Sequence, residues 1–252
     1  MKSTISLFKQ LFMVIILISF FSCDEEVLDA FTNESGVKDP TFSDSYGYLR
    51  AQKSGLPLSD ENPVTYTFSL INTAVFLDTP GSSTFSSNGG GTVICNGETM
   101  SNLFGSYWGG SIDATRAVWN IGGNSSVPAF TDSCNTFVNV TELDIDSWNN
   151  YPKGSDIIVS WNGNTENAYT LYAELEYGGT NYGDGKYLTK KLDPGTQSIT
   201  FKASDVKALY GSDEYPGVTF RLFAYYVDST TQSSKKYYFI NLTLITHAIY
   251  IR

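Results

Sequence analysis

The sequence is poor in the residues that most metal sites and enzyme sites require. Its 252 residues contain one histidine and three cysteines, too few for most zinc, haem and iron–sulfur sites. The G-x-S-x-G, H-E-x-x-H and P-loop patterns are absent, so we expect no catalysis by those mechanisms. Basic residues are also scarce, 16 against 26 acidic residues, which gives a net charge of −10. This balance argues against sequence-independent binding to nucleic acid.

Long apolar runs are missing too. A membrane-spanning helix takes about 20 apolar residues, and the longest uncharged apolar run, Leu11–Phe21, is shorter than that. This run follows Lys2 and Lys9, and a basic start followed by a short apolar segment is typical of a secretory signal peptide. We therefore expect residues 1–22 to be a signal peptide and the mature chain to be exported without a membrane helix.

The end of this segment carries a resemblance to a known class. Ser19-Phe20-Phe21-Ser22-Cys23 is similar to a bacterial lipobox, although Phe20 stands where leucine is usual. The resemblance implies that Cys23 receives a diacylglycerol thioether and becomes the first residue of the mature chain. The acidic residues that follow, Asp24-Glu25-Glu26, resemble the surface-export signal of lipoproteins in the Bacteroidota. Together these features imply an outer-membrane lipoprotein held by acyl chains and facing the cell exterior, with an ordinary signal peptide as the alternative.

The mature chain is uneven in charge, which predicts two domains. Residues 23–150 hold 16 acidic and 4 basic residues, whereas residues 151–252 hold 10 of each. Residues 23–44 are acidic and lack periodicity, so we expect a lipid anchor and a flexible acidic spacer there. We expect one domain over residues 45–142 and a second over residues 143–252.

Strand patterns dominate both predicted domains. Tyr169–Tyr177 alternates apolar and polar residues, and so do Val218–Tyr226 and Ile240–Leu244, which is the period of half-buried strands. Asn96-Gly97 predicts a tight hairpin, and Ser204–Tyr210 predicts one short helix. These patterns indicate an all-β fold of two β-sandwiches, the second immunoglobulin-like with Trp161 in its core. The segment Asp193–Ser204 is similar to a strand and turn of Ig-like modules in Bacteroidota surface proteins.

The remaining cysteines, Cys95 and Cys134, leave two alternatives open. They form an even pair in an exported protein, which is consistent with a disulfide. They are equally consistent with two buried thiols that pack as small apolar side chains.

Acidic residues are the only abundant catalytic material. Glu142, Asp144 and Asp146 form one cluster, and Glu174 and Glu176 form another. A glycosidase needs two carboxyl groups in a cleft, but we interpret both clusters as solvated surface. Calcium ligation by Asp144 and Asp146, or by the turn at 162–166, matches no EF-hand pattern.

The single histidine and the loop aromatics complete the candidate residues. His247 lies close to the C-terminus, where we expect a surface or interface residue rather than a catalytic base. Tyr107 and Trp108 lie between Gly105 and Gly109, which favours exposed rings on which a sugar or another ligand stacks. Other aromatics beside Gly, Asn or Pro are weaker candidates: Trp148, Tyr151, Tyr182 and Tyr187.

These observations predict a non-enzymatic surface lipoprotein with a binding or scaffolding role, without catalytic residues, metal or cofactor. Its expected partners are the membrane, through the acyl chains, and a glycan or a surface protein. Three alternatives stay open: a carbohydrate-binding accessory of a polysaccharide-uptake system, a carboxylate-based glycoside hydrolase, and a subunit of a surface adhesive assembly. In the last alternative, an exposed edge strand such as Tyr237–Leu244 would pair with a neighbouring protein.

Overall fold

The computed structural model shows an all-β protein with one short helix in its described part, as expected. It describes residues 37, 39–58, 63–82, 89–111, 115–145, 151–178, 186–210 and 217–252. The elements in chain order are β1 (Ser45–Pro57), β2 (Val64–Phe76), β3 (Val93–Cys95), β4 (Glu98–Thr99), β5 (Ser101–Leu103), β6 (Ser106–Ser111), β7 (Val118–Ile121), β8 (Phe130–Ser133), β9 (Asn139–Ile145), β10 (Ile157–Asn164), β11 (Thr170–Tyr177), β12 (Lys186–Leu192), β13 (Ser198–Phe201), α2 (Ala203–Tyr210), β14 (Gly217–Gln232) and β15 (Lys235–Tyr250).

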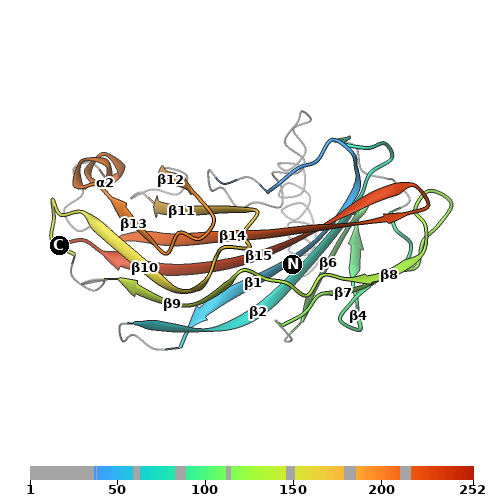
Figure 1. Cartoon of the computed structure of the whole chain (residues 1–252), viewed down its shortest axis with the longest axis horizontal. Coiled ribbons are helices and arrows are strands. Elements are labelled where there is room, and N and C mark those ends of the chain that lie inside the picture. Colours follow the sequence, from blue (N-terminus) through green and yellow to red (C-terminus); the bar gives the residue numbers. More distant parts are fainter. Residues whose placement is uncertain are drawn as a thin grey trace, which may run out of the picture.

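One large curled sheet forms the body of the molecule (Figure 1). Its strand order is β12-β11-β14-β15-β1-β2-β9-β10-β13, and the β5–β6 hairpin adds to it through pairing of β6 with β2. The described neighbours in this order pair antiparallel except β1 and β15, which are parallel. The long β14–β15 hairpin runs along most of the molecule (Figure 1). It turns at Ser233 and Ser234, which both have positive φ, and the pairing of the two strands continues up to Gln232 and Lys235.

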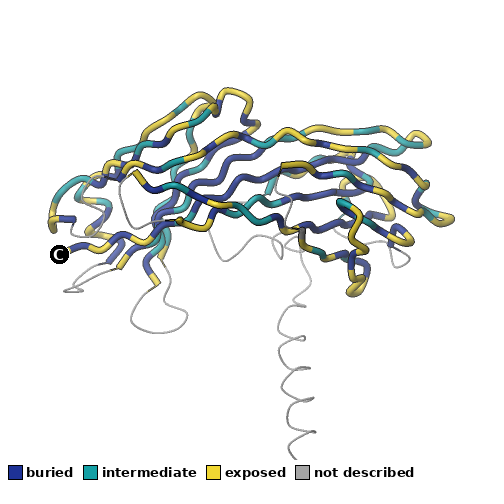
Figure 2. The backbone as a smooth tube through the Cα atoms, turned by 90° about the horizontal axis from the view of Figure 1, so that it is seen from below, coloured by how far each residue is buried: buried dark blue, intermediate teal, exposed yellow. Residues whose placement is uncertain are grey.

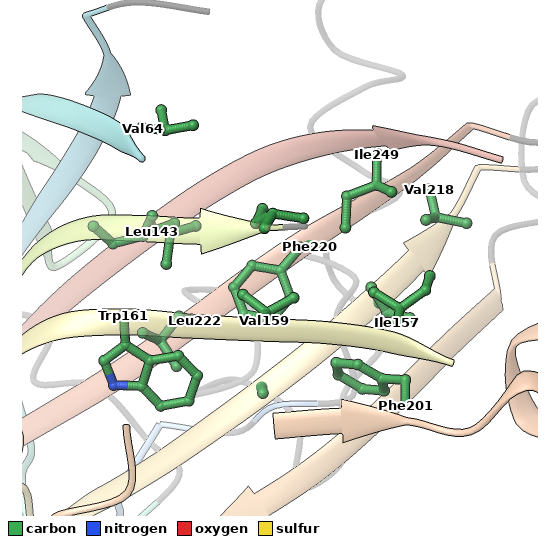
Figure 3. Packing of buried hydrophobic residues seen from close by; sticks show 14 of the residues in the cluster. Val64, Leu143, Ile157, Val159, Trp161, Phe201, Val218, Phe220, Leu222 and Ile249 are labelled. Atoms are coloured by element: carbon green, nitrogen blue, oxygen red, sulfur yellow. The ribbon is translucent and has the colours of Figure 1, made fainter. Parts of the chain in front are cut away.

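The inner face of the sheet carries two apolar cores. The first, which we call the barrel core, lies where β9, β10, β13 and α2 close over the sheet; its packing is shown in Figure 3, with Trp161, Phe201 and Phe220 among its members. Here the two edge strands approach each other, because Lys190 of β12 donates a hydrogen bond to the Thr200 carbonyl of β13 at 3.2 Å. The sheet therefore curls into a partly closed barrel at this end.

The second core, which we call the cap core, lies where a separate four-stranded sheet covers the large one. That small sheet has the order β4-β3-β7-β8, and its Trp119 is fully buried against residues that include Phe76 and Tyr237. Between the two cores, polar side chains on the inner face of β15 form hydrogen bonds to the backbone of residues 134–138. Asn241 donates to the carbonyls of Cys134 and Thr136, both at 2.8 Å, and Thr243 donates to that of Val138 at 2.7 Å.

The prediction of two Ig-like sandwich domains is not confirmed. The expected division between residues 142 and 143 falls inside β9, which pairs with β2 on one side and β10 on the other. Tyr237 and Phe239, from the second predicted domain, pack in the cap core with strands of the first. The structure thus has two cores on one shared sheet, because strands as long as β14 and β15 cross from one core to the other.

Several local predictions are confirmed. Asn96 and Gly97 form the tight turn between β3 and β4, both with positive φ, and Trp161 is a buried core residue. The helix forms over Ala203–Tyr210 with Val206, Leu209 and Tyr210 buried. The first backbone N–H of the helix has a partner outside the helix, because the Asp156 side chain accepts a hydrogen bond from the Ala203 N–H at 2.9 Å.

The outer face of the sheet is covered in a different way. A third apolar cluster lies there on β1, β14 and β15, and Val37 and Phe42 of the N-terminal segment pack against it. Figure 2 shows buried backbone running along the central strands and exposed residues concentrated at the loops and rims. Residues 37 and 39–44, expected to belong to a flexible spacer, are therefore part of the folded body; we call them the strap.

Candidate functional site

The strap is fixed to the outer face by specific polar and aromatic contacts. The Phe42 ring stacks on Tyr238 of β15, with ring centroids 3.9 Å apart and nearly parallel planes. Its backbone N–H donates to the Tyr48 hydroxyl at 2.9 Å, and that hydroxyl donates to the Phe42 carbonyl at 3.2 Å. Because main chain and side chain are both held, the strap has one defined position on β1 and β15.

An ion pair holds the first part of the strap. Asp39 Oδ2 lies 2.9 Å from Arg50 Nε, and both side chains are only 10% exposed. The burial of Tyr225, together with the negative charge of Asp39, raises the pKa of the Tyr225 hydroxyl well above its usual value. Burying a charge away from water costs free energy. Loss of one partner from this nearly buried pair would therefore destabilise the protein, because the other charge would stay buried without compensation.

A second polar contact holds the end of the strap. Asp44 accepts a hydrogen bond from the Tyr238 hydroxyl at 2.7 Å and one from the Lys236 ammonium at 3.1 Å. The bond from Tyr238, and then the bond from Lys236, lower the pKa of Asp44 below its usual value. These hydrogen bonds of the folded protein therefore favour the charged form of the Asp44 carboxyl group.

Beside the strap, the β5–β6 hairpin exposes large apolar side chains. Trp108 is 39% exposed, Leu103 58% and Phe104 75%, and Ile71 on the adjacent strand β2 is 42% exposed. These four residues make up what we call the hairpin patch. The turn of the β5–β6 hairpin is formed by Phe104 and Gly105, both with positive φ. The Asn102 side chain accepts a hydrogen bond from the Gly105 N–H at 3.0 Å.

The strand register places the strap and the hairpin patch on the same face. Arg50 of β1 lies opposite Thr73 of β2, Thr73 lies opposite Trp108 of β6, and Trp108 lies opposite Ser101 of β5. Directly opposed residues point to the same side of a sheet, and neighbouring strands lie about 4.8 Å apart. The ion pair of the strap is therefore about 10 Å, or two strands, from Trp108.

The structure separates the two expected stacking residues. Trp108 is exposed on the outer face, whereas Tyr107 points inward, is only 2% exposed and belongs to the cap core. The Tyr107 hydroxyl donates to the Gly91 carbonyl at 2.8 Å and accepts from the Gly90 N–H at 2.9 Å. The prediction of an exposed Tyr107 was wrong, because the pair lies in a strand, where neighbours point to opposite faces, and not in a loop.

Both remaining cysteines are free and buried. Cys95 and Cys134 belong to the same cap core but form no disulfide, so the structure has the second of the two alternatives. Burial raises the pKa of the Cys95 thiol to about 12 and that of the Cys134 thiol to about 11. Each thiol packs as a small apolar side chain.

The glutamates of β11 are not on a solvated face. Glu174 is fully buried and accepts a hydrogen bond from Thr189 at 2.7 Å. Arg221 of β14 forms ion pairs with Glu174 and with Glu176, and Tyr187 donates to Glu176 at 3.2 Å. The prediction of a solvated surface was wrong for Glu174, because its carboxylate is buried beside Thr189 of β12 and Arg221 of β14, and the arginine balances its charge.

The other predicted acidic cluster consists of Glu142, Asp144 and Asp146. Glu142 accepts a hydrogen bond from the exposed Asn162 side chain at 2.7 Å, and Asp146 lies outside the described residues. Across the described ranges, no three histidine, cysteine or acidic side chains gather as a metal site would need. The 162–166 turn is held by Asn164, which accepts from the Glu166 N–H at 2.9 Å.

His247 and the expected edge strand are both interior. The His247 side chain is buried on the inner face, and its Nδ1 lies 3.3 Å from the Tyr66 hydroxyl. The prediction of a surface or interface histidine was wrong, because the side chain lies on the inner face of the sheet beside Tyr66 of β2. The segment Tyr237–Leu244 is central and offers no free edge, because β15 pairs with β14 on one side and β1 on the other.

Cys23, the predicted signal peptide and the aromatics Trp148 and Tyr182 lie outside the described residues. Tyr151 is buried in the barrel core, and its hydroxyl accepts a hydrogen bond from the Ile158 N–H at 2.9 Å. None of the helices formed by described residues is long and apolar enough to span a bilayer. No protein-family model and no curated protein sequence matches this chain.

The strap was missed in the sequence because its anchoring residues are single and irregularly spaced. Asp39, Phe42 and Asp44 follow neither a helical nor a strand period, and each is held by a partner far along the chain. The available signal was the presence of the apolar residues Val37 and Phe42 shortly before β1.

Proposed function

We propose that this protein is a lipid-anchored protein of the outer membrane, exposed to the cell exterior, with a binding or scaffolding role. The lipobox-like segment ending at Cys23 and the acidic residues after it support the anchor and the outward orientation. The all-strand body supports a rigid binding or scaffolding element rather than a flexible tail.

The observation that carries the proposal is the fixed position of the strap. The 14 residue steps from Cys23 to Val37 span at most about 50 Å when fully extended. Since Val37 is buried against the outer face, an acyl-modified Cys23 would keep the body close to the bilayer. Two or more acyl chains hold a protein on a membrane stably, whereas one does so only weakly.

The glycoside hydrolase alternative gains no support from the acidic residues on β11. A glycosidase presents two carboxyl groups to a substrate in a cleft, and Glu174 is fully buried in an ion pair with Arg221. We therefore assign the Glu174, Glu176 and Arg221 network to the stability of the sheet.

Metabolic labelling with palmitate tests the anchor. The wild-type chain should incorporate label and sediment with outer membranes, and Cys23→Ser should lose both properties. Cys95→Ala is the matched control, because it removes a cysteine that cannot carry the anchor and should keep the label. Incorporation of label into Cys23→Ser would overturn the proposal.

The outward orientation has its own test. Protease added to intact cells should cleave the protein, while a periplasmic marker stays whole. Protection in intact cells together with cleavage after permeabilisation would place the protein on the inner face.

A further inference from the structure

We infer that the hairpin patch, formed by Ile71, Leu103, Phe104 and Trp108, is a lipid-contacting surface that rests on the membrane to which Cys23 is attached. The inference rests on the proposed lipid anchor and adds an orientation: the outer face of the large sheet faces the bilayer. The occupant of the patch is thus the interfacial layer of a phospholipid membrane.

The chemistry of the patch fits an interface between lipid and water. Tryptophan and phenylalanine with aliphatic neighbours are typical of segments that dip their apolar side chains below the headgroups. Neither residues 99–112 nor strand β2 contains a charged residue, although the chain has a net charge of −10. The patch is therefore a neutral region in an acidic protein, and the strap carboxylates on the same face, Asp39 and Asp44, are paired with Arg50 and Lys236.

The backbone of the hairpin also points to a role for Phe104. Its φ is 52°, a left-handed conformation that costs free energy in a bulky residue and is usually occupied by glycine or asparagine. The residue is 75% exposed, so most of its ring faces outward at the hairpin tip. Backbone strain at exposed positions of this kind is frequent at binding surfaces.

The position of the patch matches the path of the anchor. The row Arg50, Thr73 and Trp108 places the strap about 10 Å from the patch on the same face. Val37, the described residue nearest to Cys23 in the sequence, also lies on this outer face. An anchor attached there raises the effective concentration of the patch at the bilayer, so even a weak apolar contact is populated.

A glycan is the other ligand that uses an exposed tryptophan. Sugar sites combine a stacking ring with polar groups that bind the hydroxyls. Around Trp108 the outer-face neighbours are Ser101 and Thr73, directly opposite on β5 and β2, together with Ile71, Gly110, Ser106 and Leu103. These side chains are apolar or carry one short hydroxyl, and none has the amide or charged groups that usually bind several sugar hydroxyls, which favours acyl chains over a sugar.

The test measures contact between Trp108 and lipid in the full-length chain. The lipidated protein is reconstituted into vesicles of phosphatidylethanolamine and phosphatidylcholine, with or without brominated acyl chains, which quench tryptophan on contact. The chain has four tryptophans, so the measurement is made in a Trp148→Phe background. Trp119 and Trp161 are buried, and the difference between this background and the same background with Trp108→Phe isolates the signal of Trp108. We expect brominated lipid to reduce this signal, and Phe104→Ser with Leu103→Ser to remove most of the quenching.

The matched control is Ile158→Ser, which removes an exposed apolar side chain of similar accessibility from β10, away from the patch. It should leave the quenching of Trp108 unchanged. Mass spectrometry of the same sample reports whether Cys23 carries lipid. If it does not, a lipid maleimide is coupled to the Cys23 thiol, and the quenching is measured on that conjugate.

The outcomes separate the two proposals. An unmodified Cys23 overturns the proposed anchor, but quenching in the maleimide conjugate would still support the lipid-contacting patch. An anchored protein whose Trp108 is not quenched overturns the patch and leaves the anchor standing. A change in Trp108 fluorescence with cellohexaose, xylohexaose or maltohexaose, in the absence of lipid quenching, would assign the surface to a glycan instead.

Discussion

The two faces of the large sheet are covered in different ways. On the inner face, the barrel core and the cap core bury nearly every inward side chain beneath β9, β10, β13, α2 and the small sheet. On the outer face, the strap covers the apolar cluster on β1, β14 and β15, and the hairpin patch beside it stays exposed. Stability therefore resides mainly on the inner face, and the features that point to a partner lie on the outer face.

The largest predicted effect is the low reactivity of the two thiols buried in the cap core, compared with ordinary exposed thiols. Burial raises the pKa of Cys134 to about 11 and of Cys95 to about 12. At pH 8 the thiolate fraction of Cys134 should be about a hundredfold lower than that of an ordinary thiol, and the fraction of Cys95 about a thousandfold lower. Alkylation of the native protein should thus be correspondingly slow, and two thiols should react after denaturation without reductant. Rapid alkylation in the native state would mean that the small sheet does not cover the cap core.

A large core truncation should give the largest loss of stability. Phe220 is fully buried in the barrel core, so Phe220→Ala should lower the free energy of unfolding by about 3–5 kcal/mol. Thr219→Ala, the adjacent residue on the outer face of β14, is the matched control and should cost less than about 1 kcal/mol. Urea denaturation measures both, and equal effects would contradict the assignment of the two faces.

The ion pair of the strap should give an intermediate effect. Asp39→Asn leaves Arg50 nearly buried without its partner, and we expect a loss of about 2–3 kcal/mol in the free energy of unfolding. The double variant Asp39→Asn with Arg50→Met should recover part of this loss, since the unpaired charge is then removed. A loss below about 0.5 kcal/mol for Asp39→Asn would show that the strap does not depend on this pair.

Acid should loosen the end of the strap. The folded-state pKa of Asp44 is lowered by its hydrogen bonds from Tyr238 and Lys236, so its contribution is present above the unfolded pKa of about 3.9. That contribution is lost as the pH falls through the lowered pKa. The difference in urea midpoint between wild type and Asp44→Asn should be present at pH 7 and shrink toward pH 2. A difference that does not depend on pH would contradict the role of the Asp44 charge.

The smallest effect should have the opposite sign. Phe104→Gly removes the left-handed strain at the hairpin tip and should raise the free energy of unfolding by about 0.5–1 kcal/mol. Asn96→Gly, at the same φ of 52°, is the matched control. It should lower stability, because the Asn96 side chain donates to the Arg116 carbonyl and accepts from the Val118 N–H, both at 2.9 Å. A loss of stability in Phe104→Gly would mean that the ring packs within the protein.

Local patterns in the sequence predicted most strands but not how they associate. The alternation in Tyr169–Tyr177, Val218–Tyr226 and Ile240–Leu244 matches β11, β14 and β15, because a buried face imposes a period of two. The parallel pairing of β1 with β15 joins residues about 190 positions apart, and no local pattern specifies it. The two compositions of the chain predicted two domains, whereas the structure has two cores that each draw residues from both predicted domains.

Part of the candidate site could be predicted in the same way. The exposure of Trp108 followed from its glycine neighbours, but the inward position of Tyr107 depends on β6 pairing with β2. The burial of Glu174 depends on the cross-strand Arg221. Such features arise from contacts between distant segments, so composition and periodicity alone do not reveal them.

The most direct test of the account is hydrogen exchange of the full-length lipidated protein, compared between detergent micelles and phospholipid bilayers. The account predicts that the strap, residues 39–44, is protected in both, and that residues 101–111 gain protection in bilayers while β10 does not change. A strap that exchanges like an unstructured chain, or a hairpin whose exchange is the same in both environments, would contradict it.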